Sequence, residues 1–342
     1  MADPGIPNPH GAPTRPTRLA RAISPLAFGG APIGNLYAGV DEDLARRAVE
    51  RAWQHGIRHF DTAPYYGYGL SEARLGAALA TMPRGSYTLS TKVGRLIQDA
   101  PGRDPLADGF DVAGKRAVFD YSRDGVRRAV DDSLRRLRTD RVEVLLLHDI
   151  GALTHGADHP RVLRQALDEA LPALAELRAQ GVCDAIGLGV NEEEVCLEVM
   201  PRFELDVIML AGRYTLFEQA HSARVMAEAT QRGIAIFAAA PYNSGLLGGD
   251  KPGDTYNYAP ADEATRARAQ RFYDACGALD VSVGAAALQF PHFHPAVATV
   301  VCGMRTPAEA DAAAARRDTP IPAALWDRLR DEGLLGQYAV TP

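Results

Sequence analysis

Cysteine is scarce in this chain, with four among 342 residues, and no two of them have C-x-x-C spacing. This content excludes a small disulfide-stabilised scaffold, which packs many cysteines into a short chain. Long apolar runs are also missing, because no stretch approaches the roughly 20 residues that cross a bilayer. We therefore expect neither a disulfide framework nor a membrane span.

An excess of positive charge is missing as well. The 37 basic and 43 acidic residues leave a net charge of −6, so the chain offers no basic footprint for nucleic acid. The 46% hydrophobic and 23% charged residues are typical of a soluble globular protein, most simply a cytoplasmic enzyme. The length provides for one large domain or two ordinary ones.

The first 18 residues are rich in proline and lack the apolar segment of a signal peptide. We predict a disordered arm at 1–18 and a folded region at 19–342. Within that region, a helix, a glycine and a short apolar strand recur. The helical periodicity of DEDLARRAVERAWQHG ends at Gly56, and a strand is predicted directly after it.

Short strands buried on both faces and alternating with helices are typical of a parallel sheet. We count about eight, six of them at 26–28, 57–60, 87–91, 142–147, 207–210 and 298–301. No G-x-G-x-x-G motif and no composition shift mark a second domain, which favours an α/β fold with a single (β/α)8 TIM barrel. Insertions at about 96–118 and 241–261 are predicted to be extra loops on its C-terminal face.

Polar side chains follow several of these strands. In a barrel the C-terminal strand ends meet at one mouth, which brings Asp61, Lys92, His148 and Asn191 together. Each has a structural alternative: Asp61 as a turn cap, Lys92 as its ion-pair partner, and His148 as a hydrogen-bonded core histidine. These structural roles do not explain why all of these polar residues lie at the C-terminal ends of strands.

Two other chemistries have weaker support. His59 and Asp61 alternate on one strand face as metal ligands do, but only His148 follows as a third ligand, so we predict no metal centre. A serine nucleophile lacks its G-x-S-x-G elbow, and the cysteines lack a partnered base.

Tyr66 is the candidate for proton transfer at this mouth. A tyrosine hydroxyl titrates near pH ~10, and a neighbouring ammonium held by a carboxylate lowers that pKa. Asp61, Lys92 and Tyr66 are the parts of such a relay, and His148 is placed to orient a substrate oxygen. A site of this kind moves a proton on or off a carbinol oxygen, and the accompanying hydride requires a cofactor.

These residues resemble the aldo-keto reductase family. GIRHFDTAPYYGYGLSE (56–72), STKVG (90–94) and LLLHD (145–149) are similar to its signature segments. The resemblance implies a (β/α)8 barrel, an NAD(P) cofactor at the strand ends, and the tetrad Asp61, Tyr66, Lys92 and His148. Tyr65 and Tyr68 are the alternatives for the tyrosine, and the family spacing selects Tyr66.

Within the family, DTAPYYGYGLSE and PYNSGLL (241–247) resemble the aldose dehydrogenases of the L-fucose, D-arabinose and L-galactose type, and pyridoxal dehydrogenases are similar. The resemblance implies oxidation of an anomeric hydroxyl to a lactone, with Tyr66 as base. The alternatives are an NADPH-dependent aldehyde or ketone reductase, a pyridoxal dehydrogenase and, more remotely, a cofactor-sensing regulatory subunit. The sequence does not specify the sugar or the oligomeric state.

The resemblance also implies the cofactor contacts, which comprise Asn191, Ser244, Gly245, Leu246, Gly303, Arg305 and Glu309. Gly303 and the following helix N-terminus offer backbone N–H groups to a phosphate, and Arg305 is a candidate for a 2′-phosphate. Glu309 stands where relatives that prefer NADP often carry arginine, so we expect NAD.

Three positions depart from the family pattern. Val190 replaces a common serine, Ala211 a common glutamine, and Ala239 the aromatic residue that stacks on the nicotinamide. Phe237 and Tyr242 are the candidates to replace that aromatic.

Overall fold

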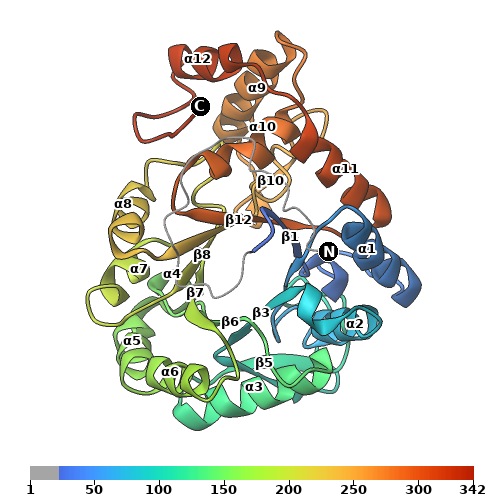
Figure 1. Ribbon diagram of the computed structural model, residues 1–342, viewed down its shortest axis with the longest axis vertical. Coiled ribbons are helices and arrows are strands. Elements are labelled where there is room, and N and C mark those ends of the chain that lie inside the picture. Colours follow the sequence, from blue (N-terminus) through green and yellow to red (C-terminus); the bar gives the residue numbers. More distant parts are fainter. Residues whose placement is uncertain (1–22) are drawn as a thin grey trace.

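The computed structural model describes residues 23–342, and the arm predicted at 1–18 lies outside this range. Eight parallel strands close into a barrel in the order β1-β12-β9-β8-β7-β6-β3-β2, which confirms the predicted (β/α)8 fold (Figure 1). The barrel strands are β1 (Leu26–Gly29), β2 (His59–Asp61), β3 (Thr88–Val93), β6 (Val144–His148), β7 (Ala185–Val190), β8 (Val207–Ala211), β9 (Ala235–Ala239) and β12 (Val297–Gly303).

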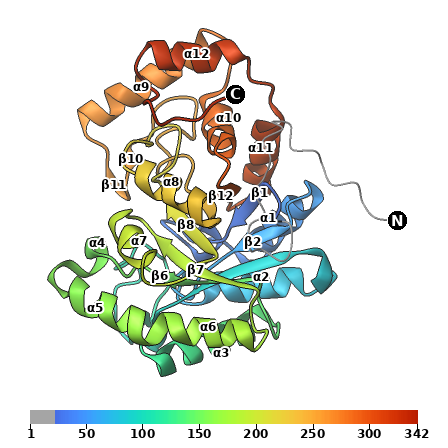
Figure 2. The same cartoon turned by 60° about the vertical axis from the view of Figure 1, so that its left-hand side comes forward.

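Helices surround the strands, and α9 and α12 extend the molecule beside the C-terminus (Figures 1 and 2). The helices are α1 (Glu42–Gln54), α2 (Leu70–Leu79), α3 (Arg123–Leu137), α4 (Ala152–His155), α5 (His159–Gln165), α6 (Leu171–Ala179), α7 (Glu194–Val199), α8 (Ala223–Arg232), α9 (Glu263–Gly277), α10 (Val283–Gln289), α11 (Pro307–Asp318) and α12 (Ala323–Asp331). Short turns are η1 (Pro32–Gly34), η2 (Arg84–Ser86), η3 (Gly156–Asp158), the π-helical η4 (Ala166–Ala170) and η5 (Phe290–Phe293). Within residues 23–342, none of the helices is long and apolar enough to cross a membrane.

Helix α1 shows how the sequence delimits these elements. The Asp41 side chain accepts a hydrogen bond from the Leu44 N–H at its start, which satisfies one of the free donors of the first turn. Just after the helix, Gly56 has φ +79°, the left-handed conformation that favours glycine. One helix face is buried against the barrel: Ala45, Ala48, Val49 and Ala52.

Both predicted insertions contain a small antiparallel hairpin. In the first, β4 (Arg95–Asp99) pairs with β5 (Lys115–Phe119), and a bridge between Leu36 and Phe110 ties this insertion to the loop after β1. In the second, β10 (Thr255–Tyr256) pairs with β11 (Ala259–Pro260). Both insertions follow the C-terminal ends of barrel strands.

The barrel interior has an apolar side and a polar side. Strands β6 to β9 contribute mainly apolar interior side chains, including Leu146, Met209 and Phe237. Strands β2 and β3 instead contribute buried polar groups: His59, Asp61, Thr88, Ser90 and Lys92. Because successive residues of a strand face opposite sides, these alternate positions all point inward. The polar side leads to the strand ends where the candidate site lies.

Candidate active site

A buried ion pair lies at the C-terminal ends of β2 and β3. The Lys92 ammonium is 2.8 Å from Asp61 Oδ2 and 3.1 Å from Oδ1, and it also donates to the Thr62 carbonyl at 2.9 Å. Both side chains are almost fully buried. The register sets this pairing, because Asp61 lies beside Ser90, two residues before Lys92 on the same strand face. A buried charge pair with its remaining groups hydrogen-bonded avoids most of the cost of desolvation.

A chain of hydrogen bonds extends from this pair into the barrel. Ser90 donates to Asp61 Oδ1 at 2.6 Å, and His59 contacts Ser90 at 3.1 Å and Thr88 at 2.8 Å. Burial, followed by the charge of Lys92, lowers the pKa of His59 to about 3, so its imidazole is neutral at pH 7. A neutral imidazole has one donor and one acceptor nitrogen. Because the Ser90 proton goes to Asp61, His59 Nε2 donates to Ser90, which leaves Nδ1 as the acceptor nitrogen facing the Thr88 hydroxyl.

Tyr66 and His148 lie next to the ion pair. The Lys92 ammonium is 4.6 Å from the centroid of the Tyr66 ring, and the Tyr66 and His148 ring centroids are 6.1 Å apart at 87°. The structure therefore brings together the four side chains of the tetrad that the family resemblance implies: Asp61, Tyr66, Lys92 and His148.

The pKa of Tyr66 differs from the expectation. Burial raises the pKa of this hydroxyl, and the Lys92 charge lowers it by less, so the net direction is upward. Burial also disfavours the charged form of Lys92, but the combined attraction of Asp61 and Tyr66 raises the pKa of Lys92 above its usual value. In the free protein, Lys92 is thus charged and Tyr66 is protonated at pH 7.

His148 is neutral. Burial, with the charges of Arg95 and Lys92, holds its pKa well below the usual value. Its Nε2 lies 3.4 Å from Asp149 Oδ2. A neutral imidazole in this position has one N–H to donate to an oxygen at the mouth.

The other predicted residues lie around the same end of the barrel. Asn191 directly follows β7, is half-buried, and has no side-chain hydrogen bond to any residue in 23–342. Ser244, Gly245 and Leu246 belong to the loop after β9, where Ser244 Oγ accepts from the Tyr258 N–H at 3.1 Å. Ser244 and Gly245 have positive φ, which turns the chain sharply at the strand end.

The remaining three residues lie between the end of β12 and the first turn of α11. Gly303 ends β12 and is exposed. Arg305 donates through Nη2 to the Leu36 carbonyl at 2.7 Å, and its buried Nε has no partner within the described chain. Glu309 accepts from the Arg305 N–H at 2.6 Å, while Thr306 Oγ1 accepts from the Glu309 N–H. Thr306 thus caps α11, and Glu309 closes the turn before it, a contact that the sequence analysis did not assign.

Phe237 and Tyr242, the two candidates for stacking on the nicotinamide, differ in how deeply they are buried. Phe237 is fully buried inside the barrel, where its ring centroid lies 5.2 Å from that of His59. Tyr242 lies in the loop beyond β9 and is half-buried, with the Arg316 guanidinium 5.0 Å from its ring centroid. Tyr242 is therefore the more exposed of the two candidates.

Within the part of the chain that the structure describes, the two alternatives, a metal centre and a cysteine nucleophile, lack the side-chain arrangement that each requires. Among residues 23–342, no group of three or more His, Cys, Asp or Glu side chains is arranged to hold a metal ion. His59, the strongest metal candidate, has both ring nitrogens engaged by hydroxyls. The four cysteines are buried and free, which suits none of them for attack on a substrate.

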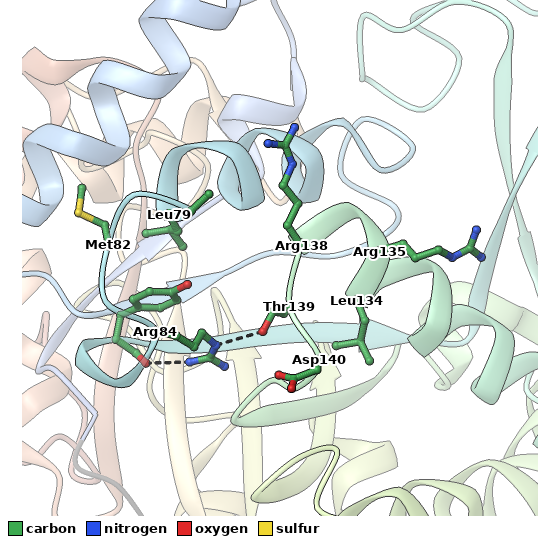
Figure 3. A pocket seen from close by; sticks show the side chains of 10 residues that line it. Leu79, Met82, Arg84, Leu134, Arg135, Arg138, Thr139 and Asp140 are labelled. Atoms are coloured by element: carbon green, nitrogen blue, oxygen red, sulfur yellow. Dashed lines mark hydrogen bonds between the residues drawn. The ribbon is translucent and has the colours of Figure 1, made fainter.

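A surface pocket of about 630 Å³ is lined by a different set of residues (Figure 3). Tyr87 and Asp140 line it, and they precede β3 and β6, so the pocket is at the N-terminal end of the barrel. The Arg84 guanidinium in its wall is already bonded to Thr139 and to the Tyr87 carbonyl (Figure 3). Barrel enzymes place their chemistry at the opposite end.

Comparison with known proteins agrees with this geometry. The model of the aldo/keto reductase family matches residues 25–331. The chain belongs to this family. Aldo-keto reductases are NAD(P)H-dependent oxidoreductases, so the enzyme class follows from the family.

Curated relatives among the aldo-keto reductases include dehydrogenases. The chain is 39% identical to a pyridoxal 4-dehydrogenase of Microbacterium luteolum (93% of this chain, 96% of the relative). It is 38% identical to a D-threo-aldose 1-dehydrogenase of Pseudomonas sp (92% and 95%). Among solved structures, the holo form of an aldo-keto reductase from Bacillus halodurans matches with a TM-score of 0.72 and 25% identity, covering 93% of this chain and 94% of that one.

Some residues at this aldo-keto reductase mouth were missed by the sequence analysis. Ser90 had a signal, because it alternates with Lys92 on β3. Arg95 and Asp149, which form an ion pair at 2.6 Å beside His148, had none: Arg95 falls at the start of an insertion, and its partner is 54 residues away.

The neutral, buried His59 gives a pH-dependent stability. Its pKa is lowered in the folded protein, so the unfolded chain binds the extra proton once the pH falls below about 6.5. The free energy of unfolding should therefore fall from pH 7.5 to 5.5, with about 1.4 kcal/mol of this loss due to His59. Urea unfolding of His59→Gln should show the loss reduced by that amount. His221→Gln, at an exposed position, should keep the full loss, and an equal loss in both variants would contradict the assignment.

Proposed function

We propose that this protein is an NAD-dependent aldose 1-dehydrogenase, which oxidises the anomeric hydroxyl of an L-fucose, D-arabinose or L-galactose type sugar to the lactone. The observation that carries the proposal is the group of Tyr66, Lys92, Asp61 and neutral His148 at one strand-end mouth. The D-threo-aldose 1-dehydrogenase at 38% identity supports the substrate class. An L-galactose dehydrogenase of Arabidopsis thaliana, 29% identical over 82% of this chain, supports it further.

Each side chain has a defined task in this proposal. Neutral His148 donates a hydrogen bond to the anomeric oxygen and holds it beside Tyr66. Tyr66, as phenolate, takes the hydroxyl proton. A bound nicotinamide would supply the acceptor for the hydride on C1. Lys92 offsets the charge of the phenolate, and Asp61 keeps Lys92 charged and in place.

The residues at this mouth fit a dinucleotide. Asn191 has an unengaged amide for the nicotinamide carboxamide, and the buried, unpartnered Nε of Arg305 lies at the start of α11. A helix N-terminus of this kind attracts phosphate, and exposed Gly303 next to it lets a ligand approach the backbone. The loop of Ser244, Gly245 and Leu246 completes the proposed cofactor contacts.

The Tyr66 assignment is tested by Tyr66→Phe. Removing the hydroxyl should lower kcat by at least about 1000-fold, because the proton then has no acceptor, while the Kd for the dinucleotide stays within about threefold. In the wild type, the rate of oxidation should rise with pH between 7 and 10, because burial raises the pKa of Tyr66. Steady-state kinetics measure kcat and its pH dependence, and a fluorescence titration measures the Kd for the dinucleotide.

Tyr68→Phe is the matched control, because the Tyr68 hydroxyl is bonded to Asp108 at 2.7 Å. It should retain most of the activity. A large loss on Tyr68→Phe with little loss on Tyr66→Phe would show that Tyr68, and not Tyr66, transfers the proton.

The substrate class is tested with a panel. L-Fucose, D-arabinose, L-galactose and pyridoxal should be compared as substrates for oxidation with NAD, and a simple aldehyde for reduction, by nicotinamide absorbance. We expect at least one aldose to have the highest kcat/KM and to give a lactone detectable by mass spectrometry. Higher kcat/KM for pyridoxal would favour the alternative suggested by the Microbacterium relative. Activity confined to aldehyde reduction would favour an ordinary reductase.

Cofactor choice is tested at Glu309. Its exposed carboxylate stands at the start of α11, where it repels a 2′-phosphate, so NAD should bind at least about tenfold more tightly than NADP. Glu309→Gln keeps an oxygen for the Arg305 N–H and removes the charge, and should narrow the ratio of Kd values. A wild-type preference for NADP would overturn the proposal of NAD.

A further inference from the structure

A second ion pair lies beside His148, formed by two residues that the proposed chemistry does not use. Arg95 Nη2 is 2.6 Å from Asp149 Oδ2, and the two side chains are only 8% and 12% exposed. Arg95 begins β4 just after β3, and Asp149 directly follows His148 at the end of β6. Both are therefore attached to the strand ends that carry Lys92 and His148.

One carboxylate oxygen connects this pair to His148. Asp149 Oδ2, which Arg95 contacts, is also 3.4 Å from His148 Nε2. Arg95, Asp149 and His148 therefore meet at one carboxylate oxygen at the strand ends.

Two hydrogen-bond donors of the Arg95 guanidinium are unused within the described chain. Its Nε and Nη1 are buried and have no hydrogen-bond partner among residues 23–342. Buried guanidinium donors are normally paired, so two unpaired donors at a mouth indicate a ligand group. An ordinary surface arginine gives no such indication.

Arg95 is held in place by its surroundings. Its guanidinium lies 3.8 Å from the Tyr65 ring centroid and 4.9 Å from that of Phe119. The preceding Gly94 has φ +104°, and a Cβ there would lie 2.4 Å from the Tyr121 ring, so only glycine provides this turn.

The backbone of Asp149 is held as well. The Tyr121 hydroxyl is 2.9 Å from the carbonyl oxygens of both His148 and Asp149. Asp149 itself has φ +49°, an uncommon conformation for a residue other than glycine, and one that tends to persist at functional sites.

We propose that Arg95 and Asp149 form a specificity subsite for a hydroxyl on the carbon next to the reacting carbon. A hydroxyl accepts from the Arg95 guanidinium and donates to the Asp149 carboxylate, so a single group satisfies both partners. Because the two charges offset each other, the subsite suits a neutral polyol rather than a phosphate or a phenolate. This inference rests on the proposed function and narrows its substrates to 2-hydroxy aldoses and 2-hydroxy aldehydes.

The test compares substrates that differ in this hydroxyl. In oxidation the pair is L-fucose and 2-deoxy-L-fucose, and in reduction it is glyceraldehyde and 3-hydroxypropanal. The wild type should favour the 2-hydroxy member of each pair by at least about 100-fold in kcat/KM, because a site built to bond a hydroxyl rejects its analogue. Arg95→Met should reduce this ratio to below about fivefold, and Arg95→Lys should give an intermediate ratio.

Arg103→Met is the matched control. Arg103 lies in the same insertion, pairs with Asp108 at 2.8 Å and packs near Tyr68, so its loss should leave the ratio unchanged. Thermal melting and dinucleotide binding identify a variant that fails to fold, in which case Arg95→Lys carries the test.

The outcomes separate the two proposals. Failure to oxidise any aldose, with the glyceraldehyde preference intact and dependent on Arg95, would overturn the proposed function but support the subsite. A wild-type ratio near one, or an equal loss for both members of a pair in Arg95→Met, would overturn the subsite.

Discussion

The buried ion pair between Lys92 and Asp61 is the interaction on which the candidate site depends. Desolvating two charges costs several kcal/mol for each ion, and the pair is stable because its other groups are also bonded, to the Thr62 carbonyl and the Ser90 hydroxyl. Removing one partner of such a pair typically costs about 3–5 kcal/mol. The neighbouring strands β2 and β3 set the pair by their register, so the barrel itself determines where the ammonium lies.

A chain of hydrogen-bonded side chains inside the barrel holds the ion pair in place. His59, Ser90 and Thr88 occupy interior positions that an apolar barrel would fill with branched side chains. Their hydrogen bonds orient the Asp61 carboxylate toward Lys92, and the opposite side of the interior is closed by apolar groups such as Phe237. This division excludes water from one side of the ammonium and leaves its other side facing Tyr66.

The loops at the mouth carry the residues of the proposed specificity subsite. The β4–β5 insertion brings Arg95 and Phe110 against Tyr65 and is tied to the loop after β1 by the bridge at Leu36. Loops on a rigid scaffold vary more readily than the strands beneath them. Pyridoxal and aldose dehydrogenases are both among the relatives of this chain.

The sequence by itself determined the fold class and the identity of the strand-end residues. Parallel strands in a closed barrel all end at one mouth, so Asp61, Lys92 and His148 had to converge once their strands were located. These inferences needed only local spacing and the alternation of a strand.

Only the tertiary structure decided what depends on contacts between distant segments. The pairing of Arg95 with Asp149 across 54 residues left no mark in the local pattern, and neither did the hydrogen bond from the Arg305 N–H to Glu309. The pKa of Tyr66 was misjudged from the sequence for the same reason. Burial raises the pKa of the Tyr66 hydroxyl and the Lys92 charge lowers it, so the net direction depends on which effect is larger. The tertiary packing around the hydroxyl decides this.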